Sequence, residues 1–251
     1  MSANAQTSAG RFVWHDHLSA DPGAASSFYA ELLGWEIEVW KPGEFDYPMI
    51  KAHEQTHGGF GPAQGGAPPH WLGHVVVEDS DAAAQRAEGA GGNVVAPAME
   101  IPEVGRMIVV ADPQGAVVSL FAPAGEASAS EGVFVWDELL TSDVEGAKRF
   151  YAEVVGWESR DVDMGEGAVY TLFGSGGVDR AGCFALPDEA EAPPHWLCYV
   201  YAADVDATAA KAEELGATKA MGPVDVRTVG RLAVLADPQG AYVGLFRPDQ
   251  A

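Results

Sequence analysis

The sequence has little of several features that mark common classes of protein. Its 251 residues include two cysteines, 14 lysine and arginine residues against 37 aspartate and glutamate residues, and no long apolar run. Two cysteines make no disulfide framework, so Cys183 and Cys198 are expected to be small buried residues. No apolar run approaches the roughly 18 residues of a membrane span, which argues against a transmembrane helix.

The acidic charge narrows the expected partners. The formal net charge is −23 at pH 7, and both halves of the chain are acidic. Such a field repels polyanions, which argues against nucleic acid and anionic membranes as partners. The opening residues, MSANAQTSAG, lack the basic and apolar regions of a secretory signal. We therefore expect a cytoplasmic protein.

The sequence contains an internal repeat. Residues 104–123 match residues 229–248 at 14 of 20 positions, and both segments contain the run ADPQGA. PPHWL at residues 68–72 recurs at residues 193–197, which is the same offset of 125 residues. FYAELLGWE near the start corresponds to FYAEVVGWE. Several matches in the same order indicate duplication. We therefore predict one domain at residues 1–124, a small polar linker at residues 125–132 and a second domain at residues 133–251.

Each copy is expected to hold two modules of the form β-α-β-β-β. In the first copy, strands are expected at residues 12–18, 35–40, 47–51 and around 58–61, with a helix from Asp21 to Gly34. The second module is expected to have strands at residues 71–77, 93–96, 106–111 and 116–121 and a helix at residues 79–89. Asp112–Gly115 is a turn signal that joins the last two strands as a hairpin. The modules could pair within one copy or across the two copies.

This pattern resembles the vicinal oxygen chelate superfamily, which includes glyoxalases, bleomycin-resistance proteins and ring-cleaving dioxygenases. The resemblance rests on the module order, the FY…LGW helix end and the DPQG turn, and it covers residues 11–123 and 133–248. It implies an α+β fold of tandem domains, each a cupped mixed sheet with helices on its convex side. It does not settle the activity, because members include isomerases, lyases, dioxygenases and binding proteins.

Metal-dependent members of the superfamily hold a divalent ion with His, Glu or Gln side chains on three strands of a cup. The matching positions in the first copy are Trp14, Leu72 and Ser119. In the second copy they are Trp136, Leu197 and Gly244. None is a good metal ligand, so we predict that no metal or other cofactor is bound. A slip of one residue in the strand register would turn every side chain to the other face and leave a divalent metal as the alternative.

Two pairs of side chains are candidates for acid–base chemistry. By strand alternation, Asp16 and His74 could point into the cup of the first copy, as an acid–base pair, a relocated metal site or a structural pair. Glu138 stands in the second copy where Asp16 stands in the first, and Tyr199 accompanies it. These four residues are the predicted catalytic set if the protein is an enzyme.

The other predicted ligand-binding residues are mostly apolar or aromatic, as in many small-molecule pockets. Arg106 and Arg231 begin matching strands and could contact a ligand, the carboxylates of Asp16 and Glu138, or acidic groups on the surface. The remaining positions expected to line the two cups are Trp14, Leu72, Ser119, Phe121, Trp136, Leu197, Tyr201, Tyr242 and Phe246. These aromatic side chains could equally fill a closed core.

These observations predict a protein that binds or processes a small hydrophobic or aromatic molecule in one or both cups. The alternative is a metal-dependent lyase or dioxygenase with relocated ligands. Because two domains in one chain can replace a dimer of single domains, we expect a monomer or a weak homodimer.

Overall fold

The computed structural model describes residues 8–41, 46–52, 54–125, 133–165, 167–187 and 192–249. The first repeat contains β1 (Phe12–Ser19), α2 (Pro22–Leu33), β2 (Glu36–Trp40), β3 (Tyr47–Ala52), β4 (Gln55–Pro62), β5 (His70–Val76), α3 (Ser80–Gly89), β6 (Asn93–Ile101), β7 (Gly105–Ala111) and β8 (Val117–Pro123). The second contains β9 (Phe134–Thr141), α4 (Val144–Val154), β10 (Glu158–Gly165), β11 (Ala168–Ser175), β12 (Val178–Ala185), β13 (His195–Tyr201), α5 (Val205–Glu214), β14 (Thr218–Val226), β15 (Gly230–Ala236) and β16 (Tyr242–Pro248).

The two repeats form two curled sheets of eight strands with the same strand order. The order is β2-β3-β4-β1-β5-β8-β7-β6 in the first and β10-β11-β12-β9-β13-β16-β15-β14 in the second. Strand β1 pairs with β4 and β5 pairs with β8 in parallel, whereas the hairpin neighbours are antiparallel. The predicted α+β fold of two tandem domains with mixed sheets is confirmed. No helix in the described part of the chain is long and apolar enough to cross a membrane.

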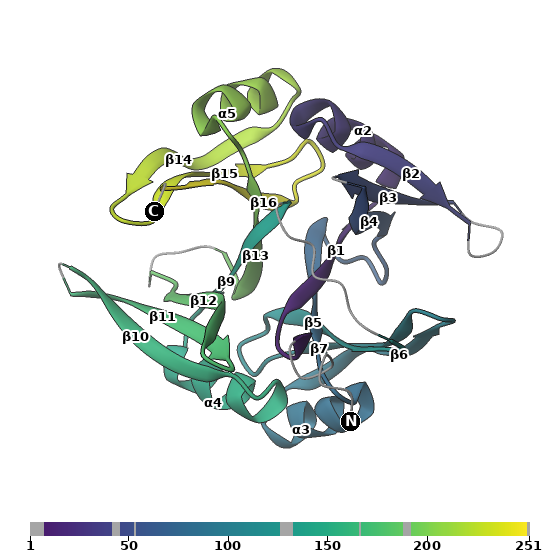
Figure 1. The fold of residues 1–251 in the computed structure, drawn as a ribbon, viewed down its shortest axis with the longest axis vertical. Helices are drawn as coiled ribbons and strands as arrows, with labels where there is room; N and C mark the ends of the chain where they lie inside the picture. The colour runs from purple at the N-terminus through teal and green to yellow at the C-terminus, as the bar shows by residue number, and fades with distance from the viewer. Residues whose placement is uncertain are drawn as a thin grey trace. The chain divides into compact units, whose positions relative to one another are not determined.

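The chain divides into two compact units, and each takes one module from each repeat. Unit 1 comprises residues 1–14, 73–129 and 136–196, and unit 2 comprises residues 15–72, 130–135 and 197–251. In unit 1 helix α3 packs beside α4, and in unit 2 α2 packs beside α5 (Figure 1). Each unit has its own hydrophobic core. The predicted linker, apart from Gly125, lies outside the described residues.

The helices begin where their capping residues predict. Asp21, Asp79, Asp143 and Asp204 each accept a hydrogen bond from the backbone N–H three residues later. Such a cap satisfies an N–H that has no partner within the helix. Gly34 ends α2 with a φ of 72°, the left-handed conformation that glycine adopts without strain.

The repeated sequence motifs meet inside the units. In unit 2 the Tyr29 hydroxyl donates to Asp237 Oδ2 at 3.1 Å and accepts from Trp71 Nε1 at 3.0 Å. In unit 1 the Tyr151 hydroxyl donates to Asp112 Oδ2 at 3.2 Å and accepts from Trp196 Nε1 at 2.8 Å. The FY, HW and DPQG motifs therefore form a buried hydrogen-bond network in each unit, and each network contains residues from both repeats.

The aspartate of each DPQG turn has a structural role. Oδ1 of Asp112 accepts from the backbone N–H groups of Gln114 and Ala116. Oδ1 of Asp237 accepts from the corresponding N–H groups of Gln239 and Ala241, and from that of Gly240. These bonds hold the tight turn, so the aspartate of the motif stabilises the fold.

One difference separates the two buried networks. His17 Nε2 lies 2.7 Å from Asp237 Oδ2, and both side chains are buried. The matching residue in unit 1 is Leu139, which is buried and apolar. Burial raises the pKa of Asp112. Burial also opposes ionisation of Asp237, but the hydrogen bond and charge of His17, with backbone N–H groups, hold the pKa of Asp237 below its usual value.

Both cysteines are buried and form no disulfide, as expected. Burial raises the pKa of the Cys183 thiol to about 12. The reactive thiolate is therefore scarce at neutral pH, which fits a packing role.

Candidate functional site

The first strand of each repeat has one fully buried face and one half-buried face. In β1, Val13, His15, His17 and Ser19 are buried, whereas Trp14, Asp16 and Leu18 are half-buried. In β9, Asp137, Leu139 and Thr141 are buried, whereas Trp136, Glu138 and Leu140 are half-buried. The predicted alternation along these strands is therefore observed, and Asp16 and Glu138 occupy matching positions.

Each of these carboxylates accepts a hydrogen bond from a tyrosine two strands away in the same sheet, across the strand that lies between them. In unit 2 the Tyr47 hydroxyl donates to Asp16 Oδ1. In unit 1 the Tyr170 hydroxyl donates to Glu138 Oε1 at 2.8 Å and accepts from Trp136 Nε1 at 2.8 Å. A hydrogen bond to a charged acceptor is stronger than one between neutral groups, so these bonds fix the carboxylates in orientation.

A glycine beneath each tyrosine makes the arrangement possible. A Cβ atom at Gly59 would lie 2.2 Å from the Tyr47 ring, and one at Gly182 would lie 1.7 Å from the Tyr170 hydroxyl oxygen. Neither separation is sterically allowed, so the tyrosines lie flat across backbone that has no side chain. We call the two sets, Asp16–Tyr47–Gly59 and Glu138–Tyr170–Gly182, the acid–tyrosine faces of units 2 and 1.

Neither tyrosine was predicted from the sequence as a site residue. Tyr170 follows Tyr47 by 123 residues, and Gly182 follows Gly59 by the same number. Matching residues of the two first strands, β1 and β9, are 122 residues apart. Extending the repeat comparison through the hairpins would have revealed both pairs. The identities around them differ too much for the match to stand out by itself.

The positions matching the family's metal ligands do not fit a metal. In unit 2 the Tyr199 ring covers Gly244, where a Cβ atom would lie 2.1 Å from the ring. In unit 1 Ser119 is fully buried, and its single neutral hydroxyl is a poor metal ligand. Across the described ranges, His, Cys, Asp and Glu side chains form no group of three that could hold an ion.

The predicted catalytic pairs lie in different units. Asp16 belongs to unit 2 and His74 to unit 1, whereas Glu138 belongs to unit 1 and Tyr199 to unit 2. Within its own unit, His74 is buried and opposite Ser119 in the β5–β8 pairing. Tyr199 is buried and packs edge-on against Phe246, with ring centroids 6.3 Å apart. Their catalytic roles stay predictions.

The two predicted arginines bind surface carboxylates. Arg106 donates two hydrogen bonds to Asp81, at 2.7 and 2.9 Å, and Arg231 donates two to Asp206, at 2.5 and 2.8 Å. Both aspartates lie in the first turn of a helix, where a negative charge is favourable. Of the alternatives open from the sequence, the structure therefore shows the surface ion pairs.

The remaining predicted ligand-binding residues differ in exposure. Leu72, Leu197 and Phe121 are buried, and Phe246 is half-buried. Tyr201 and Tyr242 are exposed, at 47% and 52% of their surface. The two tyrosines are thus accessible for stacking, whereas the leucines contribute to packing.

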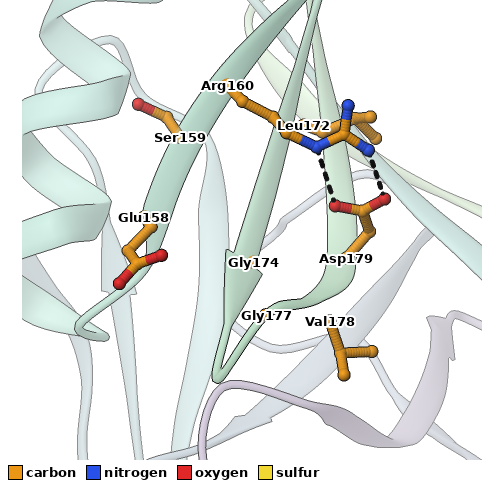
Figure 2. Close-up of a pocket in the computed structure, with 8 residues that line it drawn as sticks. All are labelled: Glu158, Ser159, Arg160, Leu172, Gly174, Gly177, Val178 and Asp179. Carbon is orange, nitrogen blue, oxygen red and sulfur yellow. Dashed lines mark hydrogen bonds and ion pairs between the residues drawn. The ribbon is translucent and has the colours of Figure 1, made fainter.

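A shallow pocket of about 160 Å³ lies on strands β10 to β12 of unit 1 (Figure 2). Figure 2 shows Arg160 paired with Asp179 across it, and Arg160 Nη2 lies 2.7 Å from Asp179 Oδ2. Leu172 lines this pocket and lies two residues after Tyr170, so its side chain shares the face of Tyr170. The pocket therefore lies on the same face of β11 as Tyr170.

A model of the glyoxalase-like domain family matches residues 13–121 and again residues 134–246. The chain belongs to this family. It is 34% identical over 245 residues to the putative glyoxylase CFP32 of Mycobacterium tuberculosis, covering 94% of each chain. It is 31% identical over 249 residues to the anthracycline biosynthesis protein DauV of Streptomyces sp. strain C5, covering 91% of this chain and 90% of that protein.

Solved structures with the same fold also superpose on this chain. The 2,3-dioxygenase LapB from Pseudomonas sp. KL28 superposes with a TM-score of 0.66 at 14% identity, covering 95% of this chain and 93% of that chain. The Mn(II)-bound glyoxalase from Novosphingobium aromaticivorans gives a TM-score of 0.62 at 18% identity, covering 95% of this chain and 81% of that chain. At these identities the similarity shows the vicinal oxygen chelate fold alone.

Proposed function

We propose that this glyoxalase-like protein binds a small hydrophobic or aromatic metabolite at an acid–tyrosine face, without a metal. The observation that carries the proposal is the repeated carboxylate held by a tyrosine that lies flat over a glycine. Within unit 1 the half-buried Trp136 lies on the same strand face as Glu138 and donates a hydrogen bond to the Tyr170 hydroxyl. Planar aromatic surface with one fixed polar group is typical of a small-molecule site.

The charge of the site favours a neutral or cationic ligand. A carboxylate accepts a hydrogen bond from a ligand hydroxyl or attracts an ammonium group, whereas it repels a ligand carboxylate. The net charge of −23 acts in the same direction over a longer range. One relative is named for anthracycline biosynthesis, and a polycyclic aromatic ligand suits these faces.

Three matched probes test the proposal. Anthracenemethanol, aminomethylanthracene and anthracenecarboxylate share a ring system and differ in charge. By fluorescence anisotropy at low salt we expect the alcohol and the amine to bind at least roughly tenfold more tightly than the carboxylate. Chelator treatment should leave these affinities unchanged.

The control is the double variant Asp16→Asn, Glu138→Gln, which keeps the shape of both faces and removes their charge. It should bind the three probes with nearly equal affinity. If none of the probes binds the wild-type protein, the proposal is wrong; a strict dependence on added metal would also contradict it.

A second candidate is acid–base catalysis at the face of unit 1. The Tyr170 hydroxyl is held between an indole donor and the Glu138 carboxylate, so the tyrosine proton points toward Glu138 and the carboxylate is fixed in place. A carboxylate fixed in this way could remove a proton next to the carbonyl group of a bound ketone and return it.

Deuterium exchange tests this candidate. Wild-type protein in D₂O should speed deuterium incorporation into the methyl group of acetylanthracene, measured by mass spectrometry. Glu138→Gln should reduce this rate roughly 10²–10⁴-fold while leaving the affinity for the uncharged acetylanthracene nearly unchanged. Equal exchange with and without protein would contradict the catalytic function and leave binding as the only proposed function.

We further propose that the protein acts in the cytoplasm as a monomer or a weak homodimer, without nucleic acid or membrane partners. The acidic charge and the two domains in one chain support this proposal. Light scattering that shows a stable dimer at micromolar concentration would contradict its second part.

A further inference from the structure

The shallow pocket on strands β10 to β12 lies outside the acid–tyrosine face of unit 1. None of the eight residues that line it is a member of that face. Its volume of about 160 Å³ is similar to that of cavities of roughly 150 Å³ that hold a single benzene ring. The pocket therefore has room for a small molecule with one ring.

The charged residues of the pocket give it a net negative charge. Arg160 donates two hydrogen bonds to Asp179, from Nε at 3.3 Å and from Nη2 at 2.7 Å, so these two charges offset one another. Figure 2 shows no hydrogen bond or ion pair between Glu158 and the other residues that line the pocket. The carboxylate of Glu158 therefore sets the sign of the charge that a ligand meets.

Unit 2 has a lysine where this pocket has a glycine. In unit 2 Glu36 is opposite Lys51 on the neighbouring strand, and the Lys51 ammonium lies 3.5 Å from Glu38. In unit 1 the matching carboxylate, Glu158, is opposite Gly174. Residues opposite one another on paired strands interact, and opposite charges there are favourable. Unit 2 thus supplies a cation opposite this carboxylate, whereas unit 1 has no side chain there.

The other lining residues suit a hydrocarbon group. Leu172 and Val178 provide apolar surface, and Val178 is 51% exposed. Gly174 and Gly177 add backbone without side chains. Covering the exposed apolar surface of Val178 with a ligand is favourable, because it removes that surface from water.

We propose that this pocket binds a small organic ammonium ion. The ammonium group lies beside Glu158, as Lys51 lies opposite Glu36 in unit 2, and one apolar ring or a short alkyl group covers Leu172 and Val178. This second binding site goes beyond the proposed function, because none of its residues belongs to an acid–tyrosine face.

Benzylamine, benzyl alcohol and benzoate are matched probes, since they share one ring and differ in charge. Binding is followed in wild-type protein at low salt by NMR, through the methyl resonances of Leu172 and Val178. Benzylamine should shift both resonances and bind about two- to fivefold more tightly than benzyl alcohol, the range expected for a solvent-exposed ion pair. Benzoate should bind more weakly than either.

Two matched variants locate the charge that is responsible. Glu158→Gln should abolish the preference for benzylamine over benzyl alcohol at these two methyl groups. Glu36→Gln is the control, because it removes the matching carboxylate of unit 2 and changes the net charge of the chain equally. It should leave the preference intact. Both glutamates are exposed, so neither variant disturbs a core.

The outcomes separate this inference from the proposed function. Absence of shifts at Leu172 and Val178 with millimolar benzylamine, or equal affinity for the amine and benzoate, would overturn the inference. An equal effect of the two variants would also overturn it. The same shifts in the double variant Asp16→Asn, Glu138→Gln would show that the site is independent of the acid–tyrosine faces. Failure of the anthracene probes to bind would contradict the proposed function alone.

Discussion

Replacing His17 with leucine is expected to lower the free energy of unfolding by roughly 1–3 kcal/mol, the usual cost of removing one partner of a buried hydrogen bond. Asp237 would remain buried and would lose the histidine that lies 2.7 Å from its Oδ2. Leucine itself should fit, because Leu139 occupies the matching buried position of unit 1. The loss would therefore report the interaction and not poor packing.

The effect should depend on pH in a definite direction. The pKa of Asp237 is lowered in the folded protein, so its contribution to stability is present above its ordinary pKa and is lost as the pH falls through the lowered value. The stability difference between wild type and His17→Leu should accordingly shrink in acid. Asp112 has a raised pKa, so protonating it in acid should relieve the cost of its buried charge and favour the folded state of unit 1.

Urea unfolding from neutral to acidic pH, combined with hydrogen exchange resolved by peptide, would measure both effects. Protection should fall first in peptides of unit 2, since the two units have separate cores. Leu139→Val is the control at the matching position and should cost about 1 kcal/mol without a pH-dependent part. An equal loss of protection in both units would contradict the assignment of the effect to the buried network of unit 2.

Replacing Gly182 with alanine is expected to have the second large effect. The new Cβ would lie 1.7 Å from the Tyr170 hydroxyl oxygen and 2.9 Å from Trp136 Nε1, so both rings must move and their bonds to each other and to Glu138 break. Overpacking of this kind costs about 1–3 kcal/mol, to which the lost hydrogen bonds add. Probe binding at the altered face should weaken as well.

A double-mutant cycle would identify the cause. Tyr170→Ala removes the group that the new methyl group strikes, so Gly182→Ala should cost much less in that background. The difference between the two costs, measured by urea unfolding, is expected to exceed 1 kcal/mol. Additive losses would mean that the glycine serves something other than the tyrosine above it. Gly89→Ala is the control for adding a methyl group without a clash, because no atom lies within 4 Å of the added carbon.

Much of the fold could be predicted from local signals in the sequence. The four capping aspartates, the glycine that ends α2 and the alternation along β1 are all visible in the sequence and recur in the structure. The repeat predicted equal halves, and the two sheets have the same strand order. Strand alternation also placed Asp16 and Glu138 on the half-buried faces of their strands.

The partners of those carboxylates could not be predicted in the same way. Tyr47 lies 31 residues from Asp16, and Tyr170 lies 32 residues from Glu138. Periodicity tells which face of a strand a side chain occupies, but the neighbour across the sheet depends on strand order and on bulges such as the one in β3 and β4. The arginines show the same limit, since their partners lie on helices 25 residues earlier.

The sequence alone determined the duplication, the module order, the family resemblance and the positions of the two carboxylates, because these follow from local composition and short-range periodicity. The tertiary structure decided that Tyr29 reaches Asp237, 208 residues away, and that each unit combines modules of both repeats. It also decided that a tyrosine over a glycine accompanies each carboxylate. Such contacts depend on how remote segments pack, and packing is set by the whole chain and not by any window of it.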